Sequence, residues 1–261
     1  MLTYPNIDPV AFTLGPLKVH WYGISYVVGI LIAWWLLRSR SRKSDWTEEQ
    51  VADLIFYGIV GVIIGGRLGS VLFYNLPYYL AHPLEIIMIT KGGMSFHGGL
   101  IGVLFAIFFY GRSAGRSFFA ISDFLAPVIP VGLGCGRIGN FINGELWGAP
   151  SSLPWAMIFP DPRAGELPRH PSQLYEALLE GLVLFIILWL FSAKPKPMMA
   201  VSGLFLLSYG VFRFSVEFVR EPDANIGYLA FDWVTMGQVL SFPMIIIGAI
   251  LLFLAYRQNR M

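Results

Sequence analysis

Three short stretches of this sequence carry the side chains best suited to chemistry, and the first surrounds His97. This histidine lies in a glycine-rich run, Gly-Gly-Met-Ser-Phe-His-Gly-Gly, at residues 92–99. A histidine titrates near neutral pH and can accept a proton, so His97 is a candidate general base. The glycines around it would allow a ligand to approach closely. A lone histidine is in general more often a satisfied structural residue, so its position alone does not decide between the two interpretations.

The second stretch is the densest polar segment of the chain, at residues 136–148. Arg137 supplies a permanent positive charge, and its planar guanidinium suits a phosphate. Asn140 and Asn143 can bind hydroxyl or ester oxygens, and the glycines leave backbone N–H groups accessible to an anion. The stretch therefore predicts a site for a lipid headgroup, although a purely structural turn is the alternative.

The third stretch is a stripe of polar residues near the end of a predicted helix. Tyr209, Arg213, Glu217 and Arg220 are spaced at i, i+4, i+8 and i+11, which places them on one face. One interpretation is an Arg213–Glu217 ion pair that holds the helix to its neighbours. The other is a guanidinium that is oriented by a carboxylate to bind a phosphate with two parallel hydrogen bonds.

The composition of the 261-residue chain is typical of a membrane protein. It is 56% hydrophobic and only 13% charged, whereas soluble domains carry roughly 25% charged residues. The formal net charge is +2, and no basic run is interleaved with aromatic residues, so nucleic acid is not an expected partner. The composition therefore predicts helices that cross a bilayer.

Seven stretches are long and apolar enough for this, since a helix needs about 20 residues to cross hydrocarbon. We predict an all-α integral membrane protein with seven transmembrane helices and a single membrane domain over residues 1–261. The predicted helices lie at about 19–37, 51–74, 95–111, 118–138, 172–193, 198–218 and 237–256.

Charged residues between the helices predict the orientation, because loops rich in Lys and Arg stay in the cytoplasm. Ten basic residues share one side if the N-terminus is periplasmic and the C-terminus is cytoplasmic. The periplasmic side then holds residues 139–170, which we expect to form a small cap. The ten residues are Arg38, Arg40, Arg42, Lys43, Arg112, Arg116, Lys194, Lys196, Arg257 and Arg260, against Lys18, Lys91, Arg163, Arg169 and Arg220 on the other side.

Ionisable side chains within the predicted helices are costly to bury and point to function. Arg67, Arg137, Arg213 and Glu217 all fall toward the outer leaflet in this topology. A single arginine there could reach the headgroups for structural reasons. Three arginines on one side of the membrane favour a functional cluster.

The remaining histidines, the serine near His97 and the single cysteine are weaker candidates for a functional site. His20, His82 and His170 share no metal-ligand spacing with His97, so we expect no metal. Ser95 does not lie in a nucleophile elbow, although an intramembrane serine protease using Ser95 and His97 is conceivable. Cys135 is the only cysteine; it is a possible nucleophile, but a small packing residue is the commoner role.

Six motifs together resemble the prolipoprotein diacylglyceryl transferase family. They occur in the family's order and extend from about residue 18 to residue 238, with no departure at the motif positions. The run from 134 to 148 is long and specific. The motifs are HWYGISY (20–26), GGRLGSVLFYN (65–75), GGMSFHGGLIG (92–102), GCGRIGNFINGELWG (134–148), RHPSQLYEA (169–177) and YGVFRFSVEFVREPD (209–223).

The resemblance implies an enzyme of seven helices in the bacterial inner membrane, with its active site toward the periplasmic leaflet. It would transfer the diacylglyceryl group of phosphatidylglycerol to the lipobox cysteine in the signal peptide of a prolipoprotein. A thioether forms and glycerol phosphate leaves, in the first step of lipoprotein maturation. The implied partners are phosphatidylglycerol, the prolipoprotein signal peptide and membrane lipids, with no cofactor.

The resemblance also implies roles for individual residues. The nucleophile belongs to the substrate, so the enzyme has to remove a proton from a thiol. His97 is the candidate base and Tyr26 a second candidate. Arg137 and Arg213 would hold the phosphate as catalytic residues, and Glu217 would orient Arg213. The implied phosphatidylglycerol-binding set is Arg137, Asn140, Asn143, Glu145, Gly148, Tyr209, Arg213 and Glu217.

Two other classes of function remain open on the residues alone. A transporter or flippase for an anionic lipid or solute would also need buried arginines, but it would leave its substrate chemically unchanged. A non-catalytic membrane scaffold would tolerate single substitutions at His97, Arg137 or Arg213. The density of motifs on the outer side favours an enzyme over both.

Overall fold

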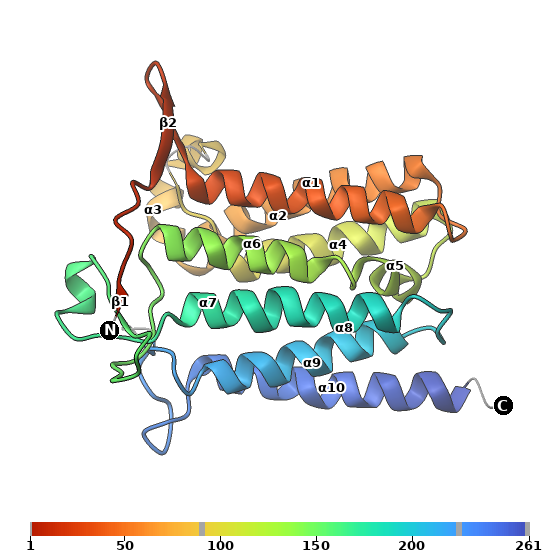
Figure 1. The fold of residues 1–261 in the computed structure, drawn as a ribbon. Helices are drawn as coiled ribbons and strands as arrows, with labels where there is room; N and C mark the ends of the chain where they lie inside the picture. The colour runs from red at the N-terminus through yellow and green to blue at the C-terminus, as the bar shows by residue number, and fades with distance from the viewer. Residues whose placement is uncertain (1, 89–91, 223–225, 259–261) are drawn as a thin grey trace. The chain divides into compact units, whose positions relative to one another are not determined.

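The computed structural model describes residues 2–88, 92–222 and 226–258. Within the predicted motifs and charge pattern, Lys91, Asp223 and Arg260 lie outside the described residues. The chain is mostly helical (Figure 1) and divides into two compact units. The first unit comprises Met1–Trp35 and Asp123–Met261, and the second comprises Leu36–Ser122. Each unit is described by itself.

Long apolar helices dominate the first unit, where α6, α7, α9 and α10 run alongside one another (Figure 1). Glycines let α9 and α10 approach closely, since a Cβ on Gly203 would lie 2.9 Å from the Leu252 nitrogen. The helices of this unit are α1 (Trp21–Ser41), α6 (Ile129–Ile142), α7 (Ser172–Glu176), the π-helical segment η4 (Ala177–Val183), α8 (Leu184–Phe191), α9 (Ala200–Val216) and α10 (Met236–Gln258). Of α1, only the residues up to Trp35 belong to this unit.

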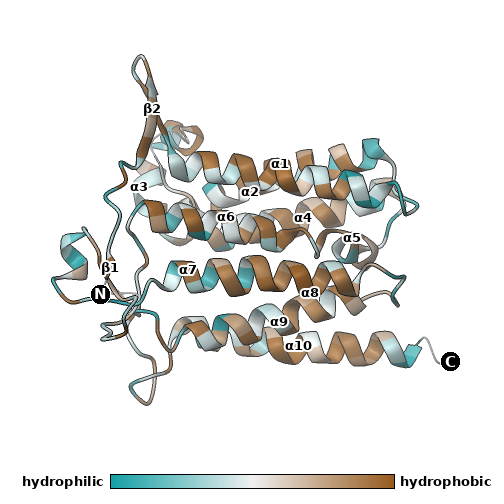
Figure 2. Cartoon of the chain, viewed as in Figure 1, coloured by the Kyte–Doolittle hydropathy of each residue, from teal (hydrophilic) through white to brown (hydrophobic). Residues whose placement is uncertain are grey.

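Five helices are long and apolar enough to cross a membrane, and a sixth qualifies if the bent pair of α5 (Phe118–Leu125) and α6 is one span. The α9 helix has 17 residues and falls just below that length. Figure 2 shows hydrophobic residues along the helices, with hydrophilic residues at the C-terminal end of α10. All seven predicted stretches are helical, and the structure supports a multi-pass membrane protein with five to six candidate spans.

Two predicted helices are interrupted. The fourth stretch breaks between α5 and α6, where Pro130 lies in the first turn of α6. Proline lacks the N–H group that an uninterrupted helix requires, so it is tolerated in a first turn. The fifth stretch is continuous from Ser172 to Phe191 but widens into a π-helix at η4. Segments of this type are often found at functional sites.

The prediction of an all-α fold was wrong in one respect, because the first unit contains two small β-sheets. β1 (Leu2–Thr3) pairs in parallel with β4 (Met157–Ile158). β2 (Val10–Leu14) and β3 (Leu17–His20) form an antiparallel hairpin, with Leu14 opposite Leu17. Gly15 occupies the turn with a φ of 58°, a conformation that glycine adopts without steric cost. The hairpin is short, and hydropathy averaged over a membrane-sized window does not reveal it.

The second unit contains α2 (Glu48–Phe73), α3 (Leu76–Ala81), the 3-10 segment η1 (Pro83–Ile87) and α4 (Phe96–Ala114). Thr47 and Gln50 form a capping box at the start of α2, which satisfies two free backbone N–H groups. The α2 and α4 helices pack through glycines at their crossing. A Cβ on Gly65 would lie 2.7 Å from the Gly102 Cα, so the backbones are in direct contact there.

This contact predicts that one glycine substitution destabilises the second unit and that another does not. A Cβ on Gly102 would overlap the Gly61 carbonyl and lie 2.9 Å from the Gly65 Cα, so Gly102→Ala should push the helices apart. We expect it to cost about 1–3 kcal/mol of stability. Gly58→Ala is the matched control, because nothing lies within 4 Å of a Cβ there. Thermal unfolding in detergent measures both, and equal melting temperatures would contradict the packing.

Candidate functional site

A buried group of charged side chains joins three helical segments of the first unit. Glu176 on α7 is completely buried and lies at its centre. Its Oε2 atom is 2.8 Å from Arg137 Nε on α6, and its Oε1 atom accepts a hydrogen bond from Arg213 Nη1 on α9. One carboxylate therefore fixes two arginines that come from distant parts of the sequence.

Glu217 forms the second anchor of Arg213, directly after the end of α9. Its Oε1 atom pairs with Arg213 Nη2 and lies 3.0 Å from Arg220 Nη1. Its Oε2 atom accepts a hydrogen bond from Thr235 Oγ1 at 2.5 Å. A Cβ on Gly237 would lie 2.6 Å from Glu217 Oε1, so the glycine leaves room for the carboxylate. The structure thus contains the ion pair that the spacing of Arg213 and Glu217 suggested.

Glu180, on η4, is the third carboxylate of the group and is held more loosely. It is completely buried, and its carboxylate oxygens lie 3.7 Å from Arg137 Nη2 and 3.8 Å from Arg213 Nη1. Among the described residues, none donates a hydrogen bond to either oxygen. Its position depends on a close helix crossing, since a Cβ on Gly181 would lie 2.7 Å from the Gly134 Cα of α6.

The predicted polar stretch after Arg137 forms a compact turn at the end of α6. The side-chain amides of Asn140 and Asn143 donate to the same atom, Glu145 Oε1, at 2.9 and 3.3 Å. Gln173 at the start of α7 donates from its amide to the Glu145 carbonyl. The structure therefore brings Asn140, Asn143 and Glu145 together, and it ties this turn to the helix that carries Glu176.

Tyr26 and Tyr209 lie on α1 and α9 of this unit. The Tyr26 hydroxyl is 3.0 Å from the Tyr22 hydroxyl, and Tyr26 on α1 faces Gly136, the neighbour of Arg137. Tyr209 lies on α9, one turn before Arg213, and its ring stacks on Phe205 at 5.8 Å.

Gly148 has a packing position within this unit. Its N–H donates to the His170 carbonyl at 2.8 Å, and a Cβ there would overlap the Val219 carbonyl. A side chain at residue 148 would therefore separate the strand-like segments that run beside it. Cys135 is also in a packing position, with its Cβ 3.3 Å from where a Cβ on Gly29 would lie.

His97 belongs to the second unit and lies in the first turn of α4. Ser95 caps this helix by accepting a hydrogen bond from the Gly98 N–H at 3.1 Å. The His97 side chain is exposed, and its ring meets the edge of the Phe96 ring at 5.7 Å. The histidine is therefore accessible at the start of a well-capped helix.

Arg67, which the sequence grouped with the other outer arginines, has a structural role in the second unit. Its buried guanidinium donates to the backbone carbonyls of Glu85, Ile86, Met88, Gly92 and Gly93. Its donors are thus occupied by the segment that leads to His97. The interpretation of Arg67 as part of a functional cluster of outer arginines is not supported, because backbone carbonyls already occupy its N–H donors.

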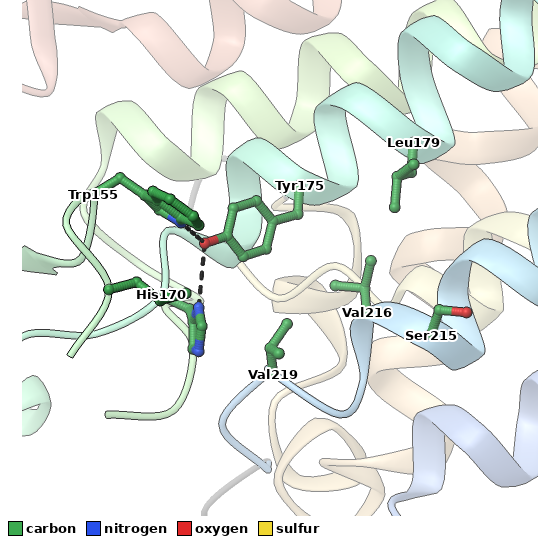
Figure 3. Close-up of a pocket in the computed structure, with 8 residues that line it drawn as sticks. Trp155, His170, Tyr175, Leu179, Ser215, Val216 and Val219 are labelled. Atoms are coloured by element: carbon green, nitrogen blue, oxygen red, sulfur yellow. Dashed lines mark hydrogen bonds between the residues drawn. The ribbon is translucent and has the colours of Figure 1, made fainter. Parts of the chain in front are cut away.

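A shallow apolar pocket of about 310 Å³ lies on the first unit. Figure 3 shows that Trp155, His170 and Tyr175 form its polar end. Trp155 Nε1 donates to the Tyr175 hydroxyl at 2.7 Å, and His170 Nδ1 is 3.2 Å from the same oxygen. Burial lowers the pKa of His170 below its usual value, which keeps the ring neutral at pH 7. In the described part of the chain, no group of three His, Cys, Asp or Glu side chains is arranged so that it could hold a metal ion.

Sequence reasoning missed Glu176 and Glu180 as site residues. Glu176 lies inside one of the six motifs but received no role, and Glu180 was overlooked within an apolar stretch. The signal was available, because a carboxylate in a predicted transmembrane helix requires a partner.

Comparison with known proteins agrees with the motifs. The family model described as prolipoprotein diacylglyceryl transferase matches residues 9–254. The chain belongs to this family. It is 64% identical over 262 residues to a protein of Methylococcus capsulatus, with 99% of each chain covered. It is 59% identical over 261 residues to a protein of Pseudomonas aeruginosa, covering 99% of this chain and 97% of the relative. Both relatives are named phosphatidylglycerol–prolipoprotein diacylglyceryl transferase, and the prediction of a transferase is confirmed.

The central position of Glu176 predicts a large loss of stability when its charge is removed. Glu176→Gln leaves Arg137 and Arg213 buried without their shared carboxylate, and we expect a cost of about 3–5 kcal/mol. Glu221→Gln is the control, because Glu221 is 44% exposed in its 2.8 Å pair with Arg169 and should contribute less than about 1 kcal/mol. Unfolding in detergent compares the two, and similar losses would contradict the central role of Glu176.

Proposed function

We propose that this protein transfers the diacylglyceryl group of phosphatidylglycerol to the lipobox cysteine of prolipoproteins, with release of glycerol phosphate. The observation that carries the proposal is the pair of arginines, Arg137 and Arg213, fixed by the one buried carboxylate of Glu176. Family membership and the names of the relatives agree with this activity.

The two arginines suit the phosphate of the lipid. Their side chains remain about 19% and 11% exposed, so neither side chain is fully enclosed by protein. Guanidinium groups bind phosphate oxygens with paired hydrogen bonds and remain charged throughout the reaction. Because Glu176 and Glu217 hold them in place beforehand, little reorganisation is needed as charge develops on the leaving phosphate.

The reaction removes one proton and breaks one C–O bond. The thiol of the substrate loses its proton, and the thiolate attacks the glyceryl carbon that is bonded to the phosphate oxygen. The electron pair of the broken bond leaves with glycerol phosphate, whose phosphodiester has become a monoester. His97 is the proposed base because it is exposed at the start of α4, and Tyr26, which faces the residue beside Arg137, is the second candidate.

The turn after α6 suits the glycerol end of the lipid. Asn140, Asn143 and Glu145 share one hydrogen-bonded cluster, and the buried Asn143 Oδ1 accepts no hydrogen bond from the described residues. A glycerol hydroxyl could donate to such an oxygen. Tyr209 would line the site beside Arg213, and Gly148 would act by allowing its surroundings to pack closely.

The proposal includes the topology predicted from charge. Seven helices would cross the bacterial inner membrane as one membrane domain, with a periplasmic N-terminus and a cytoplasmic C-terminus. Residues 139–170 would form the periplasmic cap above the active site. Support for a cap comes from a small core in which Met157, Phe159 and Ala164 of this segment pack with Tyr4. Phosphatidylglycerol and the signal peptide of the prolipoprotein would be the partners.

An assay with the purified protein in detergent tests the function. Phosphatidylglycerol and a lipobox peptide are supplied, and the release of glycerol phosphate is measured. We expect release only with a peptide that contains cysteine. Arg137→Ala, Arg213→Ala and His97→Gln should each lower kcat/KM by at least about 100-fold, since each removes charge stabilisation or proton transfer.

Arg163→Ala is the matched control, because Arg163 is 80% exposed and its side chain contacts Asp161 and the Trp147 ring rather than the charged group around Glu176. We expect it to retain the activity of the wild type. Absence of glycerol phosphate with every lipid tested would contradict the transferase. Movement of unchanged phosphatidylglycerol across vesicles would then identify a transporter instead.

A further inference from the structure

The least satisfied buried group near the proposed phosphate site is the Glu180 carboxylate. It is completely buried, and no described residue donates a hydrogen bond to either of its oxygens. Buried polar atoms are normally hydrogen-bonded, so this exception calls for an explanation. By contrast, Glu176 accepts a hydrogen bond from Arg213, and Glu217 accepts them from Thr235 and Arg220.

The charges of the group are balanced without a ligand. Arg137, Arg213 and Arg220 contribute three positive charges, and the three glutamates 176, 180 and 217 contribute three negative charges when ionised. The phosphodiester of the lipid would add a further negative charge. An unbalanced charge is costly in a buried site. Removal of one negative charge would therefore favour binding of the phosphate.

Glu180 is the carboxylate best placed to lose its charge. Arg137 and Arg213 pair with it, and both distances exceed those of a hydrogen bond. A phosphate that takes up the same guanidinium groups would leave it with no positive partner at short range. It lies in the π-helical segment η4, and its carboxylate lies beside both arginines.

The charged and titratable groups that face Glu180 come from every segment packed against it. Arg137 faces it from α6, Glu176 from α7, and Arg213 and Tyr209 from α9, while Arg220 acts from the segment after α9. Arg137 and Arg213, the two arginines that pair with Glu180, are permanently charged. Glu176 accepts a hydrogen bond from Arg213. A proton that enters this group would therefore be placed most readily on Glu180.

We propose that Glu180 takes up a proton when phosphatidylglycerol binds, so that the site accepts the lipid phosphate together with one proton. This inference rests on the proposed function, because it places the phosphate at Arg137 and Arg213. Glu180 is a positioning residue in this scheme. Its proton comes from solvent and returns to solvent when glycerol phosphate leaves. Its neutral form no longer competes with the phosphate for the two arginines, which Glu176 continues to hold.

Calorimetry measures the proton directly, without the acceptor peptide. Phosphatidylglycerol is titrated into the detergent-solubilised wild-type protein in two buffers with different ionisation enthalpies, at about pH 8. We expect uptake of close to one proton per lipid bound. Glu180→Gln, which resembles the protonated residue, should bind the lipid with no proton uptake, and Glu180→Asp should restore the uptake.

Kinetics provides the second readout. In the wild type, KM for phosphatidylglycerol should rise with pH, by up to about tenfold per pH unit where Glu180 must gain its proton. In Glu180→Gln, KM should be nearly independent of pH, and it should fall below the wild-type value at high pH. A purely structural role would instead change KM by the same factor at every pH.

Two results would overturn the inference: lipid binding by the wild type without proton uptake, or unchanged proton uptake in Glu180→Gln. If Glu180→Gln does not fold, proton uptake on lipid binding by the wild type and by Glu180→Asp still tests the inference. If phosphatidylglycerol binds with proton uptake but no peptide is modified, the proposed function fails while the inference on Glu180 stands.

Discussion

The placement of Glu176 between Arg137 and Arg213 is the interaction on which the rest of the first unit depends. A carboxylate that is completely buried within a helix of a membrane protein is costly unless its charge is matched at short range. Here the match comes from α6 and α9, which flank α7. The three segments are therefore held in register by a charge requirement as well as by apolar packing, and the two guanidinium groups are held at defined positions.

Glycine makes this arrangement sterically possible. Gly134 and Gly181 bring α6 and η4 into backbone contact beside the charged group, and Gly237 leaves the space that the Glu217 carboxylate occupies. Larger residues at these positions would move the helices or the carboxylate away from the arginines. In a bilayer, helix association relies on close packing and on polar contacts. The same glycines serve both needs, which explains their concentration near the charged residues.

The three glutamates differ in how tightly they are held, and this difference has functional consequences. Glu176 accepts a hydrogen bond from Arg213 and forms an ion pair with Arg137, and Glu217 forms a second ion pair with Arg213. These contacts fix the groups that would stabilise a developing negative charge. Glu180 has only ion pairs at 3.7 and 3.8 Å, which are longer than hydrogen bonds. A site that combines two firm anchors with one loosely paired carboxylate can keep its geometry while its charge changes, which suits a reaction on an anionic lipid.

The sequence by itself determined the membrane class, the location of every long helix, the family, and the local Arg213–Glu217 pair. These depend on composition, on motifs and on spacing within one helix, all of which are local properties. Only the tertiary structure decided that Glu176 joins Arg137 to Arg213, that Glu180 faces both, and that Arg67 is satisfied by backbone carbonyls. Helical periodicity assigns a residue to a face but does not identify the segment opposite, and the π-helical turn at η4 alters that periodicity where Glu180 lies.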